Sequence, residues 1–232
     1  MSRCLGVEAS RQVDVEMRTL SVVSQKGGSG RTTLSVNLAV AAERAGLSCA
    51  IVDLDPQASG WKWSQRRKSE APEVITAVAE QLESIQTKAA EGGLDLLIID
   101  SAPHADRAAL LACKVADLIL IPTRASILDL DALKPVLELV EMARRPALGV
   151  LNGVSTQTSL DVEEARDAIK ARGVELHAAY IHERVIYKRS LIDGRTVIEA
   201  GSDAKAIREI GGLFAAVVER MGLEIPAGEV AA

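Results

Sequence analysis

The chain has 232 residues, of which 48% are hydrophobic and 25% charged, so it can bury a full core without disulfides or a structural metal. A formal net charge of -5 argues against a protein that coats nucleic acid over its whole surface, although a local basic patch stays compatible with it. Three scattered cysteines without CxxC spacing, no apolar run of about 18 residues and no signal-peptide core favour a cytoplasmic protein.

Residues 1–17 are polar and of mixed charge, and a second methionine, Met17, stands just before the first aliphatic run. We expect these residues to form a loose N-terminal extension. No linker-like composition interrupts residues 18–232, which we therefore expect to form a single domain.

Short aliphatic runs alternate along the chain with stretches that repeat apolar residues every three or four positions. The runs predict strands at Thr19–Ser24, Cys49–Asp53, Leu94–Asp100, Asp117–Pro122 and Ala147–Asn152. The repeats predict helices at Thr32–Ala45, Ala79–Glu91, Leu128–Arg145, Leu160–Arg172 and Asp203–Met221. Gly46 and Gly173 stand where helix C-caps belong. This alternation predicts an α/β fold, a doubly wound and mostly parallel sheet flanked by helices.

A glycine-rich turn follows the first predicted strand and opens the first long helix. Residues 24–33 read Ser-Gln-Lys-Gly-Gly-Ser-Gly-Arg-Thr-Thr. Glycines let backbone amides face an anion, and a helix N-terminus adds partial positive charge, so the turn suits phosphate. The general P-loop pattern is missed twice, at Gln25 and Arg31, which leaves an ordinary glycine turn as the alternative.

Residues 26–33 fit a more specific pattern. They resemble the deviant Walker A motif of the ParA/MinD family of P-loop ATPases, whose signature is the early lysine, here Lys26. Three further blocks resemble family motifs in order and spacing, over roughly residues 19 to 200: Val52–Gln57 (VDLDPQ), Leu97–Pro103 (LIIDSAP) and Ile121–Leu130 (IPTRASILDL). Small relatives of this kind have no N-terminal helix-turn-helix, and none fits before Thr19.

The resemblance implies ATP and Mg²⁺ as ligands and assigns roles to individual residues. Thr32 would offer its hydroxyl to Mg²⁺, while Asp53 and Asp100 would hold the metal's waters. Asp55 would orient the attacking water, and Lys26 would reach across a dimer to the partner's phosphates. The implied nucleotide-binding residues are Lys26, Gly27, Gly28, Ser29, Gly30, Arg31, Thr32, Thr33 and Asn152, the last against adenine.

Simpler interpretations stay open for several of these residues. Asp53 and Asp55 could be helix-cap or turn residues, and Asn152 could be a turn residue. Asp100 is different, because a carboxylate at the end of an apolar strand needs a cation or donors. Arg31 departs from the family's lysine, and guanidinium is larger and planar. We expect it to slow hydrolysis relative to an Arg31→Lys variant.

The family resemblance also implies an ATP-dependent homodimer that binds DNA without sequence preference and meets a ParB-like or other adaptor. The matching basic residues, interleaved with acidic ones, are Arg184, Lys188, Arg189, Arg195, Lys205 and Arg208. A solvated mixed-charge face is the alternative. The C-terminal tail is acidic and contains a proline, so we expect no membrane binding.

The implied function is a slow ATPase, stimulated by DNA and a partner, that partitions plasmid or chromosome DNA and associates with the nucleoid in its ATP state. Two alternatives remain at this point. The chain could position a protein cargo or assist conjugation. It could also be a nucleotide-gated binding scaffold whose turnover Arg31 impairs.

Overall fold

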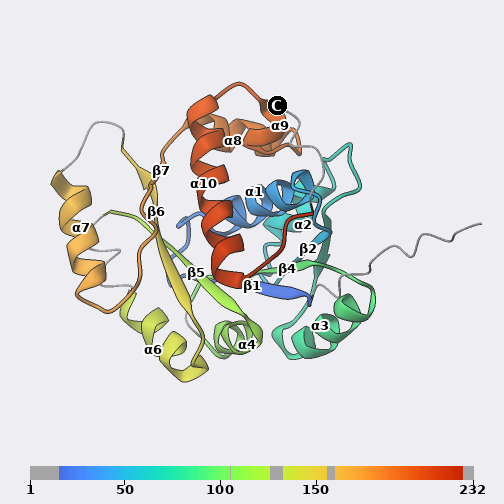
Figure 1. Ribbon diagram of the computed structural model, residues 1–232, viewed down its shortest axis with the longest axis horizontal. Helices are drawn as coiled ribbons and strands as arrows, with labels where there is room; N and C mark the ends of the chain where they lie inside the picture. Colours follow the sequence, from blue (N-terminus) through green and yellow to red (C-terminus); the bar gives the residue numbers. More distant parts are fainter. Residues whose placement is uncertain (1–15, 105, 126–132, 156–159, 227–232) are drawn as a thin grey trace, which may run out of the picture.

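The computed structural model describes residues 16–104, 106–125, 133–155 and 160–226. They form one sheet of seven parallel strands in the order β3-β2-β4-β1-β5-β6-β7 (Figure 1). The strands are β1 (Arg18–Val22), β2 (Cys49–Asp53), β3 (Glu73–Thr76), β4 (Leu96–Asp100), β5 (Leu118–Thr123), β6 (Ala147–Val154) and β7 (Ile181–His182). The predicted α/β fold with a doubly wound parallel sheet is therefore confirmed.

Helices cover both faces of the sheet (Figure 1). They are α1 (Arg31–Arg44), α2 (Ser59–Ser64), the 3₁₀ turn η1 (Ala79–Gln81), α3 (Leu82–Glu91), α4 (Arg107–Val115), α6 (Leu133–Ala143), α7 (Leu160–Lys170), α8 (Val185–Ile192), α9 (Val197–Ala200) and α10 (Ala204–Met221). No described helix is both long enough and apolar enough to cross a bilayer.

Aliphatic side chains of the central strands form the core on both faces. On one face, Leu20, Ile98 and Leu120 pack with residues of α1 and α10. On the other face, two smaller clusters join the sheet to η1, α3, α4, α6 and α7. The strands are buried from both sides, which explains why they read as continuous apolar runs in the sequence.

The observed elements differ from the predicted ones mainly at their ends and in the short segments. The first strand ends at Val22 rather than Ser24, and the fourth begins at Leu96 rather than Leu94. No helix or strand was predicted where β3, α4, β7, α8 and α9 lie. Gly46, with φ +83°, follows the end of α1 as predicted. Residues 1–15 of the predicted extension and residues 128–132 of one predicted helix lie outside the described residues.

The carboxyl ends of the parallel strands meet at one edge of the sheet, where ligands of doubly wound folds bind. The register aligns Asp53, the last residue of β2, with Asp100, the last residue of β4. Asp100 in turn aligns with Val22, the last residue of β1. The glycine-rich turn after β1 therefore stands beside both aspartates.

Candidate nucleotide site

The glycine-rich turn has a backbone that only glycine adopts without strain at two positions. Gly28 has φ +76° and Gly30 φ +97°, both in the left-handed region. A Cβ on Gly30 would also lie 2.0 Å from Nδ2 of Asn152. Gly30 stands immediately before α1, whose first backbone N–H groups have no acceptor within the helix. The turn thus places free amides and the positive end of a helix dipole at the edge of the sheet.

Side chains from neighbouring strands hold the turn in this shape. The Asn152 amide, from β6, donates a 2.6 Å hydrogen bond to the Ser29 carbonyl oxygen. The Arg124 guanidinium, just after β5, donates to the Gly28 carbonyl at 3.1 Å. Asn152, predicted to contact adenine, therefore contacts the phosphate loop itself, and its contact to a base stays a prediction. Arg124 was not among the predicted site residues, although its position directly after β5 was the available signal.

Arg31 lies beneath the loop, with its side chain buried. Its guanidinium donates to the carbonyl oxygens of Ser24 (3.2 Å), Lys26 (2.9 Å) and Ser101 (3.0 Å). Burial lowers the pKa of Arg31, while Asp100 and Asp55 oppose that shift. The guanidinium therefore binds the loop's own acceptors, which is how this position accommodates the larger side chain.

Asp100 is a buried carboxylate whose two oxygens have no well-formed hydrogen bond to any described residue. Burial raises its pKa to about 7; the nearby Thr32 hydroxyl and Arg31 favour the charged form, and Asp53 opposes it. A carboxylate with vacant lone pairs beside a hydroxyl has the hard oxygen chemistry that Mg²⁺ prefers. Thr32 and Asp100 therefore fit the metal role predicted for them.

Asp53 has a different environment. Its carboxylate accepts hydrogen bonds from the backbone N–H groups of Asp55 (3.0 Å), Gly60 (2.9 Å) and Trp61 (3.1 Å). Burial raises its pKa, while these three amide bonds oppose the rise. The carboxylate thereby ties the end of β2 to the start of α2. These contacts match the simpler interpretation of Asp53 as a helix-cap or turn residue, and its predicted metal-water role stays a prediction.

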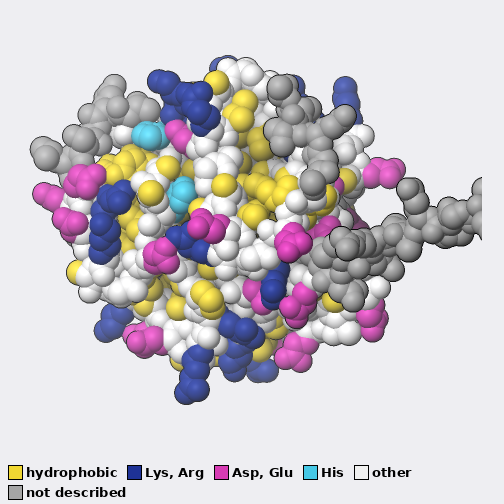
Figure 2. Space-filling view, viewed as in Figure 1, with side chains coloured by type: hydrophobic (Ala, Val, Ile, Leu, Met, Phe, Trp, Pro, Cys, Tyr) yellow, Lys and Arg dark blue, Asp and Glu magenta, His cyan; other side chains and the backbone are white. Residues whose placement is uncertain are grey.

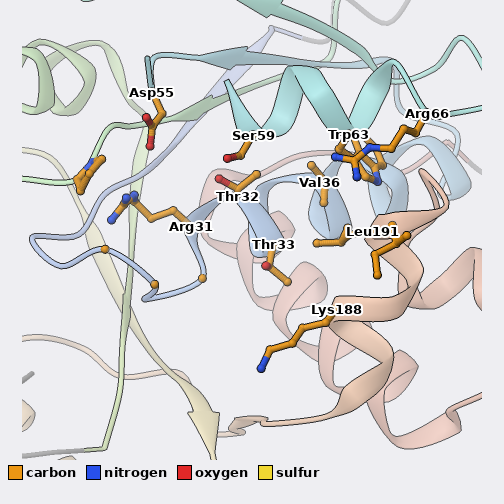
Figure 3. Close-up of a pocket in the computed structure, with 15 residues that line it drawn as sticks. Arg31, Thr32, Thr33, Val36, Asp55, Ser59, Trp63, Arg66, Lys188 and Leu191 are labelled. Atoms are coloured by element: carbon orange, nitrogen blue, oxygen red, sulfur yellow. The ribbon is translucent and has the colours of Figure 1, made fainter. Parts of the chain in front are cut away.

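A cavity of about 430 Å³ opens beside the phosphate loop, between α2 and α8 (Figure 3). Its lining includes Gly27, Gly28, Gly30, Arg31, Thr32, Thr33 and Asp55, as well as Val36, Trp63, Arg66, Lys188 and Leu191. Figure 3 shows the Asp55 carboxylate above Arg31 and on the same side of the loop as Thr32. Lys26 is exposed on the loop. Among the described residues, no three His, Cys, Asp or Glu side chains form a metal cluster. A cation bound through Thr32 would therefore take its other ligands from phosphate and water.

The six residues predicted for DNA binding have unlike environments. Arg184 is bound through its guanidinium to Glu209, and its side chain is only 15% exposed. Lys188 lines the cavity beside the phosphate loop. Arg189, Arg195, Lys205 and Arg208 are exposed. Figure 2 shows Lys and Arg side chains gathered over the start of α10.

Comparison with known proteins places this geometry in a family. A model described as the CobQ/CobB/MinD/ParA nucleotide binding domain matches residues 20–223. The chain is 31% identical to "Maintenance of carboxysome distribution protein A" of Gloeobacter kilaueensis, over 78% of this chain and 84% of that protein. It is 28% identical to the protein of the same name from Halothiobacillus neapolitanus, over 81% and 90%. A "Chromosome partitioning protein ParA" of Caulobacter vibrioides is 25% identical over 84% and 94%.

Solved structures share the fold. A McdA–ATP complex from Cyanothece superposes with a TM-score of 0.69 at 20% identity, covering 90% of this chain and 98% of that one. The MinD cell division protein of Aquifex aeolicus gives a TM-score of 0.70 at 18% identity, covering 91% and 100%. Together with the domain match and the phosphate-loop geometry, these similarities show that the chain belongs to the ParA/MinD family of P-loop nucleotide-binding proteins.

Proposed function

We propose that this chain is an ATPase that dimerises on ATP and positions a large protein cargo by cycling on and off DNA. Two of its relatives carry the name of carboxysome distribution, and they match it over at least 78% of its length. That name supports protein cargo, the alternative of the sequence analysis, above DNA partition.

One observation carries the nucleotide part of this proposal. The left-handed glycine turn, the start of α1 and the unsatisfied carboxylate of Asp100 lie at the same edge of the sheet. The turn suits phosphate oxygens, and Thr32 with Asp100 would hold Mg²⁺, whose charge would offset that of the phosphates. Asp55, at the cavity, would orient the attacking water. Lys26, exposed on the loop, would reach the phosphates bound by a second copy.

Isothermal titration with Mg²⁺-ATP, followed by steady-state hydrolysis assays, tests the enzyme. We expect binding that an Asp100→Asn variant weakens, and slow turnover that an Asp55→Asn variant removes without loss of binding. Absence of Mg²⁺-ATP binding would contradict the nucleotide site itself. Binding without turnover, in the presence of DNA and the partner, would favour the nucleotide-gated scaffold, which the contacts of Arg31 to loop carbonyls would then explain.

Partition of DNA is the second candidate, and the similarity to the Caulobacter ParA supports it. Deletion of the gene in its host separates the two. If the cargo is a protein assembly, its even spacing in the cell is lost while plasmids and chromosomes are inherited normally. Loss of plasmids or chromosomes, with protein assemblies still evenly spaced, would favour partition.

A further inference from the structure

A second cavity, of about 690 Å³, lies apart from the phosphate loop. It opens between the end of α1, the segment after α2 and the link between α8 and α9. Its lining consists of Arg44, Arg67, Lys68, Ser69, Asp193, Gly194, Arg195 and Glu199. Four cations thus face two carboxylates, in a protein whose net charge is negative.

Both carboxylates in this lining already have hydrogen-bond or ion-pair partners. Glu199 accepts two hydrogen bonds from the Arg67 guanidinium, at 2.9 and 3.0 Å, and its Oε2 also accepts from Thr196. Asp193 pairs with Arg195 at 3.0 Å, and both of these side chains are about half exposed. Such exposed pairs are weak and open readily to a competing anion.

Arg44 and Lys68 supply the excess positive charge. Both are exposed, and neither forms an ion pair with a residue that the structure describes. Arg44 is the last residue of α1, where the helix dipole offsets part of its charge. Lys68 has no such compensation. An anion in the cavity would therefore meet cations from two segments.

The backbone beside this cavity is joined to the nucleotide site through α2. Asp53 holds the first amides of α2, and the Trp63 indole N–H donates to the Arg195 carbonyl at 3.2 Å. Gly194 packs tightly against the segment after α2: a Cβ on Gly194 would lie 2.5 Å from the backbone of Arg66. A shift of α2 on nucleotide binding would therefore move the cavity's wall.

We propose that this second cavity, through Arg44, Lys68 and Arg195, binds the phosphate backbone of duplex DNA. This proposal rests on the proposed function, in which the protein cycles on and off DNA. It makes Arg44 and Lys68 DNA contacts in addition to the basic residues predicted in the C-terminal third. An extended polyanion suits the cavity better than a compact ligand does, because its cations are exposed and spread over separate segments.

The test measures the anisotropy of a fluorescent duplex of random sequence across a salt series, in Mg²⁺-ATP, for the full chain. The Arg44→Gln/Lys68→Gln variant should bind on the order of tenfold more weakly, and the slope of log affinity against log salt should fall by about 2. A Lys88→Gln variant is the matched control, because Lys88 is exposed on α3, on the opposite face of the sheet. Its affinity and salt slope should equal those of the wild type.

The outcomes separate the two claims. If the wild type binds DNA and the double variant matches the Lys88 control, the cavity is not the DNA site and the proposed function stands. If the wild type binds ATP and dimerises but does not bind DNA, the DNA part of the proposed function is wrong, and the cavity proposal is wrong with it. Thermal melting and nucleotide titration of the double variant show that its fold and its nucleotide site are intact.

Discussion

Arg31 stands where the ParA/MinD motif has a lysine, and its guanidinium holds the glycine-rich loop through hydrogen bonds. A lysine ammonium is compact and would point between phosphates, whereas the Arg31 guanidinium spreads over the carbonyls of Ser24, Lys26 and Ser101. Binding of phosphate must compete with these hydrogen bonds or leave the guanidinium beneath the loop. In either case a transferred phosphate would receive less positive charge than a lysine would provide.

Arg31→Lys should therefore raise the rate of hydrolysis. We expect an increase of about tenfold in kcat, or about 1.4 kcal/mol of transition-state free energy. An Arg31→Gln variant, which removes the charge, should fall below the wild type. Steady-state assays of the three proteins check this, and equal or slower turnover by the lysine variant would show that guanidinium serves the phosphates as well as ammonium.

Asp100 should make the nucleotide-free protein less stable as pH rises. Burial raises its pKa from 3.8 to about 7, so the folded state favours the protonated form. The stability cost is absent below the unfolded value, grows between pH 4 and 7, and is complete above pH 7. Asp100→Asn should thus stabilise the apo protein by roughly 2 to 4 kcal/mol at pH 8, and by little at pH 4.

Urea unfolding of wild type and Asp100→Asn at the two pH values measures this difference. The variant should at the same time lose affinity for Mg²⁺-ATP, because an amide cannot replace the carboxylate toward the cation or its waters. A stability difference that is the same at both pH values would mean that Asp100 does not titrate in this range.

Between elements, the Arg67–Glu199 pair joins the segment after α2 to α9. Both side chains are largely buried, at 4% and 16% exposure. Burial would raise the pKa of Glu199, but its hydrogen bonds with Arg67 and Thr196 outweigh burial and lower it. The pair therefore stabilises the fold above about pH 4.5, and the stabilisation is lost as pH falls through the folded pKa.

Removal of one partner should be costly. We expect Arg67→Met or Glu199→Gln to destabilise the protein by about 3 kcal/mol at pH 7, because each leaves a buried group unpaired. The double variant should lose less than the sum of the two. A double-mutant cycle from chemical unfolding checks this, and strictly additive losses would show that the two side chains do not interact energetically.

At the level of elements, the sequence located the helices and strands that are long and have a strong pattern of apolar residues. β2 was placed correctly because Cys49–Asp53 is buried on both faces and reads as an apolar run. β7, with only two residues, carries no periodicity. α4 was missed despite an available signal, the Asp106 side chain that caps it through the Ala109 amide.

The candidate site was predictable where chemistry requires a residue type at a fixed spacing. Gly28 and Gly30 were found because only glycine suits a left-handed turn before a helix. The hold of Asp53 on α2 is local in the chain and was among the sequence interpretations, as a helix-cap or turn residue. The contact of Asn152 with Ser29 was not predictable, because it depends on how separate elements pack. The buried pairing of Arg184 with Glu209 was not predictable for the same reason.

For the whole molecule, the proposed function is a nucleotide switch that needs two copies of the chain. Lys26 is exposed on the loop, where it would meet phosphates held by another subunit. Nucleotide state would be transmitted through Asp53 and α2 toward the segment that packs on Gly194. The triphosphate would thus control both the contact between subunits and the surface proposed to bind DNA.

Light scattering coupled to size-exclusion chromatography measures whether the bound nucleotide controls dimerisation. With Mg²⁺-ATP, the wild type should elute at twice the 24.6 kDa mass of one chain, and with Mg²⁺-ADP as a monomer. Lys26→Ala should bind ATP and stay monomeric. A wild type that binds Mg²⁺-ATP but has one and the same mass with ATP and with ADP would contradict the account.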